Sequence, residues 1–395
     1  MLKFGVIAAA AAAVALGGQA LAQGKAPQGV SKDEVLVGSH TDLSGPAAIW
    51  GVSVTNGIRM RFDEVNATGG VHGRKIKVIV EDSAYTIPKA VSATDKLLKK
   101  DKVFAMLGNL GSPMNMATIP DILKAGVPNL FPLSAAATMY EPHERLKFAF
   151  AMSYADQMRG ASKYFVEQRG KKRVGILYQD DDFGQDVLSG VEAQLKAMGM
   201  ELVAKTTYKR GAKDFSSQIA VLRQANADLV VLGTIIAESI GAYAEAKKIG
   251  WNVDMVVCSA GYTPQVAELA PQGVTAGLYG TGQSPILYPD TAGPEAKVWM
   301  DNYKKKFNRD ADLQSMAGCG IADMFVTALD RAGKDLTTDA SVKGIESIQN
   351  YRDIFGSAAQ TFGPNRRLGA DPKTAASLYQ IDKNKRWVFV DRMTF

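Results

Sequence analysis

The chain alternates short runs of β-branched and aliphatic residues with amphipathic helical patterns, and this order occurs in two successive blocks. Strand patterns such as VLVGS at residues 35–39 and VGILY at residues 174–178 are each followed by a helical pattern. Strict alternation of this kind forms parallel sheets that are covered by helices. The two blocks are similar in length but do not repeat one another closely. The sequence therefore predicts an α/β protein with two doubly wound parallel-sheet lobes.

The C-terminal part of the chain follows a different order. Helical patterns over residues 293–305, 315–332 and 341–348 precede two strand patterns over residues 377–382 and 386–392. A chain that ends in a strand hairpin after a run of helices returns to a sheet that it has already left. We therefore expect the chain to cross between the lobes more than once.

The N-terminus predicts an exported protein. Lys3 precedes an apolar segment over residues 4–16, and Ala20-Leu21-Ala22 has the small-x-small pattern of a cleavage site. The segment is too short to span a bilayer, for which about 20 apolar residues are needed. We interpret residues 1–22 as a signal peptide cleaved near Ala22, and we expect a mature protein that does not span the membrane.

Composition argues against several classes of function. The net charge of +6 is spread along the chain without basic runs interleaved with aromatic residues, so we expect no nucleic-acid partner. Three scattered histidines lack the spacing of metal ligands, and no metal site is expected. Cys258 and Cys319 lie in apolar patterns, and although export permits a disulfide, we favour two packed free thiols.

Ligands of parallel sheets bind beyond the carboxyl ends of the strands, and two loops there carry a serine. The turn GNLGSP at residues 108–113 contains Ser112, and the loop PLSAAAT at residues 132–138 contains Ser134. Four functions fit a serine in such a turn: a catalytic nucleophile, a phosphate cradle, a seat for a carboxylate, or a plain helix cap. The same edge carries three neighbouring aspartates at residues 180–182, which we interpret as a solvated turn that caps a helix.

The first two functions lack their usual partners. A nucleophilic Ser112 needs a base, yet no histidine falls in a loop that would face it, and the G-x-S-x-G pattern does not occur. The chain also has no nucleotide-binding glycine motif, so no nucleotide cofactor is expected. Backbone N–H groups at helix N-termini carry partial positive charge. We therefore expect Leu110-Gly111-Ser112 and Ser134-Ala135-Ala136 to share one carboxylate, with capping as the alternative.

At these loops the chain resembles the periplasmic solute-binding proteins of the leucine/isoleucine/valine-binding type, which have the type 1 periplasmic binding fold. The matching segments cover nearly all of the chain after the leader: residues 44–51, 57–83, 108–113, 127–136, 174–186, 214–234 and 273–280. The resemblance implies two lobes that are joined by three crossings and close around a small ligand. It also implies a periplasmic monomer without cofactors that delivers its ligand to an ABC permease with a separate ATPase.

The resemblance implies lobe boundaries as well. Residues 31–152 and 284–359 would form the N-terminal lobe, and residues 153–283 and 360–395 the C-terminal lobe. In the amino-acid binders of this family, the turns that match Leu110, Gly111, Ser112, Ser134 and Ala135 hold the ligand carboxylate. By the same comparison, Trp50 forms part of the pocket wall and Phe183 packs on the ligand, with ordinary packing as the alternative for both.

The chain departs from the amino-acid binders on the opposite wall. Their acidic residue that pairs with the ligand ammonium is replaced by Ala260, and the expected tyrosines are replaced by Ile235 and Ile236. Tyr262 stands near the same rim. An ammonium buried without a partner costs several kcal/mol.

Three acids remain as substitutes for the missing partner, namely Asp42, Asp182 and Glu238. Unless one of them takes that role, we expect a carboxylate with an aromatic or apolar body. A branched-chain amino acid is the alternative ligand. An exported hydrolase and a sensor lobe are the remaining functional alternatives.

Overall fold

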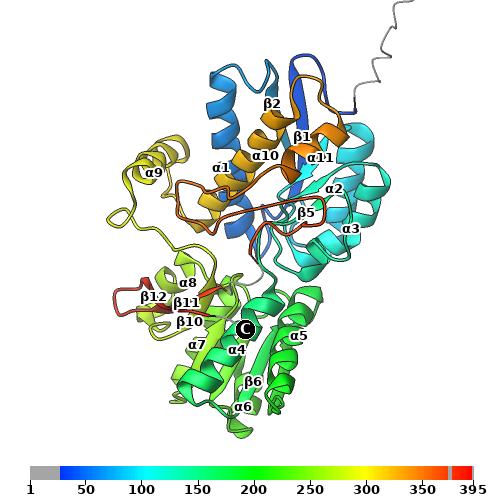
Figure 1. The fold of residues 1–395 in the computed structure, drawn as a ribbon. Coiled ribbons are helices and arrows are strands. Elements are labelled where there is room, and N and C mark those ends of the chain that lie inside the picture. Colours follow the sequence, from blue (N-terminus) through cyan, green and yellow to red (C-terminus); the bar gives the residue numbers. More distant parts are fainter. Residues whose placement is uncertain (1–26, 372–375, 394–395) are drawn as a thin grey trace, which may run out of the picture.

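The computed structural model describes residues 27–371 and 376–393, so the expected signal peptide over residues 1–22 lies outside the described residues. Figure 1 shows two lobes, one above the other, each with strands at its centre and helices around them. This arrangement confirms the predicted α/β class with two parallel-sheet lobes. Among the described helices, none is both long and apolar enough to cross a membrane.

The first lobe is built on a parallel sheet with the strand order β2-β1-β3-β4-β5. Helices cover it, and strand β1 is therefore buried along most of its length. Residue Glu34 of β1 pairs with Lys75 of β2, which sets the register. The strands are β1 (Glu34–Thr41), β2 (Lys75–Asp82), β3 (Ala105–Leu107), β4 (Asn129–Leu130) and β5 (Lys147–Phe148).

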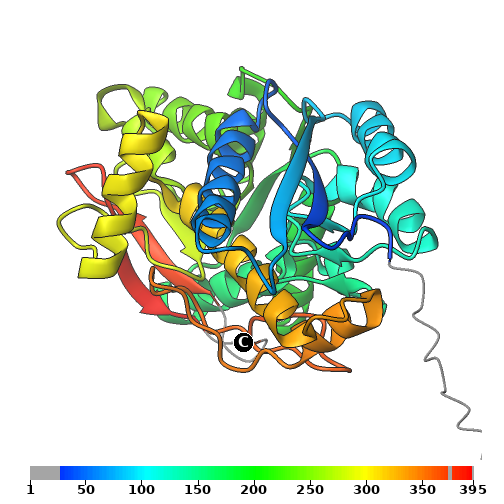
Figure 2. The same ribbon diagram turned by 90° about the horizontal axis from the view of Figure 1, so that it is seen from above.

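Figure 2 shows helices on both sides of this sheet, with α1 and α10 together on one side. Helices α1 and α10 pack at backbone distance, because a Cβ on Gly57 would lie 2.0 Å from the Ser315 carbonyl oxygen. The helices of this lobe are α1 (Ala48–Ala67), α2 (Ile87–Asp95) with its π-helical extension η1 (Lys96–Lys100), α3 (Ser112–Lys124), η2 (Ala137–Met139), α9 (Pro294–Phe307), α10 (Leu313–Ala332) and α11 (Thr338–Glu346).

The second lobe has a larger sheet with the order β12-β11-β10-β9-β8-β6-β7. Its strands are parallel except for the C-terminal hairpin β11–β12, which pairs antiparallel with β10 and confirms the predicted return of the chain to a sheet. The strands are β6 (Val174–Gln179), β7 (Ala204–Tyr208), β8 (Leu229–Gly233), β9 (Asp254–Val257), β10 (Tyr279–Gly282), β11 (Ser377–Ile381) and β12 (Trp387–Arg392). The helices are α4 (Tyr154–Arg169), α5 (Asp182–Ala197), α6 (Ser216–Gln224), α7 (Ile236–Lys248), α8 (Pro264–Glu268) and η3 (Pro271–Gly273).

The last crossing between the lobes comes later than the expected boundary at residue 359. The ring of Phe362 lies 5.6 Å from that of Phe131 and 5.9 Å from that of Phe148, both in the first lobe. Leu368 forms a parallel bridge with Ala149. Residues 360–371 therefore pack on the first lobe, because the Phe362 ring fits into the core of that lobe. The chain crosses to β11 of the second lobe only after this segment.

Both cysteines are free and buried, as the sequence predicted. Burial raises the pKa of the Cys258 thiol to about 12, so it stays protonated at neutral pH. Among the described residues, no group of histidine, cysteine and acidic side chains has the geometry of a metal site.

Candidate functional site

A cavity of about 170 Å³ lies between the lobes, where the strand-end loops of both sheets meet. Its volume is far above the roughly 10–15 Å³ that one water molecule needs, so it has room for an organic ligand. All ten residues singled out from the sequence border it: Trp50, Leu110, Gly111, Ser112, Ser134, Ala135, Phe183, Ile235, Ala260 and Tyr262.

The two predicted serines meet in this cavity. The Oγ atoms of Ser112 and Ser134 lie 2.8 Å apart, and Ser134 Oγ also accepts the N–H of Ala136 at 3.2 Å. Ser112 is the first residue of α3, and the preceding Gly111 has φ +95°, a conformation that glycine adopts without strain. Because the two hydroxyls share one hydrogen bond between them, one hydroxyl proton of the pair is available for a ligand.

The backbone donors of this seat differ from those expected. The N–H of Leu110 donates to the His40 carbonyl at 3.1 Å, and the N–H of Gly111 donates to the Leu133 carbonyl, also at 3.1 Å. These bonds hold the neighbouring strand ends together, so neither N–H is available for a ligand. Within the described chain, the N–H of Ser112 has no acceptor and lies at the N-terminus of α3, where an anion is favoured.

Tyr154, at the start of α4, completes the seat from the second lobe. Its N–H donates to the Ala135 carbonyl at 2.8 Å, and its ring lies 4.9 Å from the Phe183 ring in an edge-to-face arrangement. Burial raises the pKa of the Tyr154 phenol well above its usual value, and the Ala135 backbone N–H acts in the opposite direction. The phenol is therefore neutral and adds a hydroxyl beside the Ala135 N–H.

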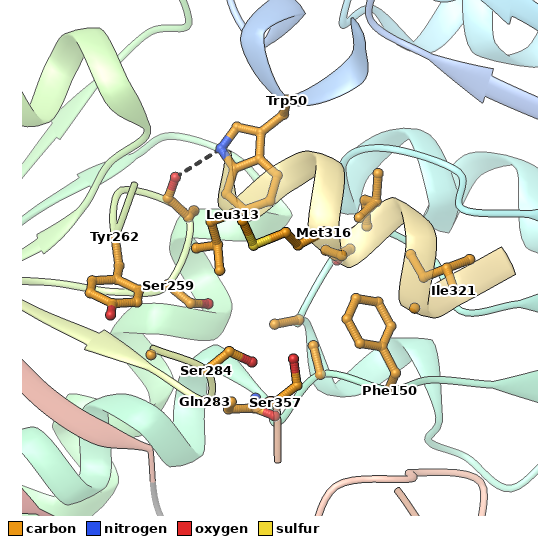
Figure 3. Close-up of a pocket in the computed structure, with 18 of the residues that line it drawn as sticks. Trp50, Phe150, Ser259, Tyr262, Gln283, Ser284, Leu313, Met316, Ile321 and Ser357 are labelled. Carbon is orange, nitrogen blue, oxygen red and sulfur yellow. Dashed lines mark hydrogen bonds between the residues drawn. The ribbon is translucent and has the colours of Figure 1, made fainter. Parts of the chain in front are cut away.

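Trp50 joins the two lobes across the cavity. Its indole Nε1 donates to the backbone carbonyl of Ala260 at 3.1 Å, the bond drawn as a dashed line in Figure 3. Trp50 projects from α1 of the first lobe, and Ala260 follows β9 of the second. Trp50 therefore borders the cavity, as expected, and also connects the two lobes.

The acids considered as substitutes for the missing partner do not reach the cavity. Asp42 accepts the N–H groups of Gly45 at 2.5 Å and Ala47 at 2.7 Å, so both its oxygens are used to cap the start of α1. Asp182 is exposed at the start of α5. Glu238 is only 1 % exposed and is absent from the described lining, and burial raises its pKa.

The three consecutive aspartates form a helix-capping turn, as predicted, but Asp181 at its centre is largely buried rather than solvated. Asp181 is the N-cap of α5 and accepts the N–H of Phe183 at 3.1 Å, and it forms an ion pair with Arg210 at 3.0 Å. The helix-cap interpretation is confirmed. The cap also positions Phe183, which follows it by two residues and packs against Tyr154.

Tyr262 borders the cavity mainly as part of the second lobe's core. Its ring stacks on Tyr379 at 4.6 Å and meets Trp387 edge-to-face at 5.0 Å. A Cβ on Gly282 would lie 2.2 Å from this ring, so glycine is needed for the close packing. Figure 3 shows the Tyr262 ring to one side of the group formed by Trp50 and Leu313.

A large part of the lining was not predicted from the sequence. It comprises one face of α10, the end of β5, and the two crossing segments near residues 283–285 and 351–360. The helix spacing gave no distinct signal, because an apolar stripe on a helix is equally typical of a buried core face. The crossing segments have no periodicity at all, so only the fold brings them to the site.

The charge of the lining is unusual for a site that would hold an anion. Among the described residues that border the cavity, none is lysine, arginine or histidine, and Asp353 is the sole carboxylate. Any anion in this cavity would be held by neutral N–H and O–H groups. Such donors bind reversibly, and the described lining offers no base beside Ser112 that would make it a nucleophile.

Comparison with known proteins identifies the family. A model of the periplasmic binding protein family matches residues 34–386. An amino acid binding protein of Pseudomonas aeruginosa is 27% identical over 261 residues, which cover 65% of this chain and 69% of that protein. The solved structure of a fatty acid ABC transporter substrate-binding protein from Thermomonospora curvata superposes with a TM-score of 0.82 at 24% identity, covering 93% of this chain and 94% of that one.

A second solved structure, a branched chain amino acid ABC transporter from Thermus thermophilus with bound valine, has a TM-score of 0.82 at 16% identity and covers 92% and 97% of the two chains. At such identities the structural likeness concerns the fold, whereas the family model spans nearly the whole described chain. The resemblance inferred from the strand-end loops is confirmed, and the chain belongs to the periplasmic binding protein family.

Proposed function

We propose that this chain is the exported ligand-binding subunit of an ABC importer, and that it binds an organic carboxylate with an apolar or aromatic body by closure of the two lobes. The ligand carboxylate would accept the N–H of Ser112 and one hydroxyl of the Ser112–Ser134 pair. The hydroxyl of Tyr154 would complete the seat from the second lobe. ABC permease subunits with a separate ATPase are the partners that this function requires.

The observation that carries the proposal is the environment of Ala260. Its side chain is a methyl group, and its carbonyl oxygen already accepts the indole N–H of Trp50. An α-ammonium group beside it would lose its hydration and meet no counter-ion at that wall, because Asp353, the sole carboxylate of the described lining, faces Gly320 of α10. The loss costs several kcal/mol. A penalty of that size weakens binding by more than a hundredfold.

The fold itself accommodates more than one ligand class. One structural neighbour is named as the substrate-binding protein of a fatty acid ABC transporter, and another holds bound valine. The fold therefore does not determine the ligand class. The residues that line the cavity favour a carboxylic acid without an amino group. A branched-chain amino acid is the second candidate, favoured by the amino acid binding proteins among the relatives.

A thermal-shift panel tests the proposal, because a ligand that binds only the folded state raises the melting temperature. The panel contains aromatic acids, aliphatic acids, their primary amides, and leucine. We expect the acids to raise the melting temperature and their amides, which lack the negative charge, to have no effect. Stabilisation by leucine together with no response to any acid would instead support the branched-chain amino acid.

A further inference from the structure

We propose that the cavity has a second arm along helix α10 that holds a long apolar tail, and that Asp353 on its wall excludes ligands with a second negative charge. This inference rests on the proposed function, because it assumes that the other end of the ligand is the carboxylate held by Ser112 and Ser134. The ligand class that follows is a long-chain monocarboxylic acid whose far end is neutral.

The first observation is a continuous stripe on α10. Six residues of this helix line the cavity at the spacing i, i+3, i+4, i+7, i+8 and i+11, namely Leu313, Met316, Ala317, Gly320, Ile321 and Met324. That spacing places all six on one helix face. At 1.5 Å per residue, the stripe runs for roughly 16 Å.

The length of the stripe exceeds what an amino acid can fill. Four C–C bonds of about 1.5 Å separate the carboxyl carbon of leucine from its terminal methyl group, so the molecule spans at most about 6 Å, less than half of the stripe. A single branched-chain amino acid could therefore contact only part of the stripe. A ligand with a long apolar tail covers the surface and is favoured by the hydrophobic effect.

The opposite wall of the arm carries aromatic side chains that pack against their neighbours. Phe150, which follows β5, lies near Ile321 in Figure 3. Phe355 packs edge-to-face on Trp299 at 4.9 Å, and the Tyr351 hydroxyl donates to Asp323 at 2.8 Å. These contacts orient the aromatic side chains of Phe355 and Tyr351 on the wall of the arm.

Gly320 keeps the arm open at its middle. The atom nearest to a Cβ built on Gly320 is Oδ2 of Asp353, at 3.5 Å, which is an ordinary contact. An alanine therefore fits at this position, whereas a longer side chain would enter the space between α10 and Asp353. The arm can thus be closed by substitution without disturbing the packing of α10 against α1.

Asp353 sets the charge of the arm. Its Oδ1 accepts the N–H groups of Phe355 at 2.9 Å and Ser357 at 3.1 Å, and its Oδ2 faces Gly320. Since the described lining contains no cation, a second carboxylate in the arm would face a like charge without compensation. A neutral tail end, or one that donates a hydrogen bond, meets no such repulsion.

The length of the tail is tested with Gly320→Leu, using Gly320→Ala as the matched control. Straight-chain and aryl-alkyl monocarboxylic acids of increasing length are titrated by calorimetry. We expect affinity of the parent to rise with length, and Gly320→Leu to lose about tenfold or more for the long acids while short acids change less than about twofold. Retained binding of the short acids shows that the variant is folded.

The charge of the arm is tested with Asp353→Asn, whose amide oxygen can still accept from Phe355 and Ser357. We expect long dicarboxylic acids to bind this variant about tenfold more tightly than they bind the parent, with long monocarboxylic acids unchanged. Equal affinity of short and long acids for the parent, or no effect of either substitution, would overturn the arm alone. Absence of binding by every acid would instead overturn the proposed function.

Discussion

At the scale of single residues, the sequence predicted which loops meet but not which atoms are free. Ser112 and Ser134 could be placed together because parallel strand ends share one edge of a sheet. The loss of the Leu110 and Gly111 donors could not be foreseen, since their acceptors, the carbonyls of His40 and Leu133, come from two other strand ends. Loop sequences alone do not reveal such backbone pairing.

The serine pair gives a direct test of the seat. We expect Ser112→Ala and Ser134→Ala each to weaken binding of an acid by about tenfold, because a hydrogen bond to a charged group contributes about 1.5–3 kcal/mol. Isothermal titration calorimetry with the best acid of the panel measures the loss. Ser216→Ala on the exposed start of α6 is the control and should leave affinity unchanged. Full affinity in both seat variants would contradict the assigned role.

At the scale of elements, most helices and strands follow from periodicity, and the exceptions have physical reasons. Helix α1 begins at Ala48, and buried Asp42 fixes the turn before it by accepting the N–H of Ala47 at 2.7 Å. The stripe on α10 was predicted as helix but not as a ligand surface. Whether an apolar helix face meets a core or a cavity depends on partners that are distant in sequence.

Helix α5 links three segments through one partly buried acid, Asp186. Asp186 accepts the N–H of Ala137 in the first lobe at 3.1 Å and the N–H of Ala155 at the start of α4 at 3.0 Å. Burial raises its pKa from 3.8 to about 6, opposed by these two hydrogen bonds and assisted by the nearby Asp156 and Glu141. The folded chain therefore holds this proton more tightly than the unfolded chain does.

The free energy of unfolding should consequently fall as the pH rises from about 4 to 6. In that window the folded state binds more protons than the unfolded state, and a shift of about two units corresponds to about 3 kcal/mol. We expect Asp186→Asn to flatten this part of the pH profile, measured by urea denaturation at several pH values. The exposed Asp182→Asn is the control and should retain the slope of the parent. An unchanged slope in Asp186→Asn would assign the pH dependence to other groups.

At the scale of the whole molecule, side chains bridge the two lobes. Besides the bond from Trp50 to Ala260, Gln265 of α8 donates to Asp312 at 3.0 Å, and Arg210 donates to the Tyr85 carbonyl at 3.0 Å. The resemblance of the loops to a known family predicted two lobes and a hinge. The bridges themselves could not be predicted, because each joins residues from different lobes.

The indole bridge should contribute to the lifetime of the closed state. We expect Trp50→Phe to keep the aromatic wall but lose the hydrogen bond to Ala260, and to weaken ligand binding by about fivefold, since such a bond contributes about 1 kcal/mol. Stopped-flow measurements should show the change in the dissociation rate rather than in the association rate. A slower association with unchanged dissociation would show that the ring acts in ligand entry instead.

The uncharged character of the seat has a consequence for delivery. A seat that binds a carboxylate through uncharged N–H and O–H groups is left with no unpaired charged side chain when the lobes separate. Water then replaces each hydrogen bond to the ligand. Capture by such a site also depends little on the salinity outside the cell, since screening acts on pairs of charges. Under the proposed function, the protein would therefore bind its ligand at low and high salt alike, and would release it at the permease by opening alone.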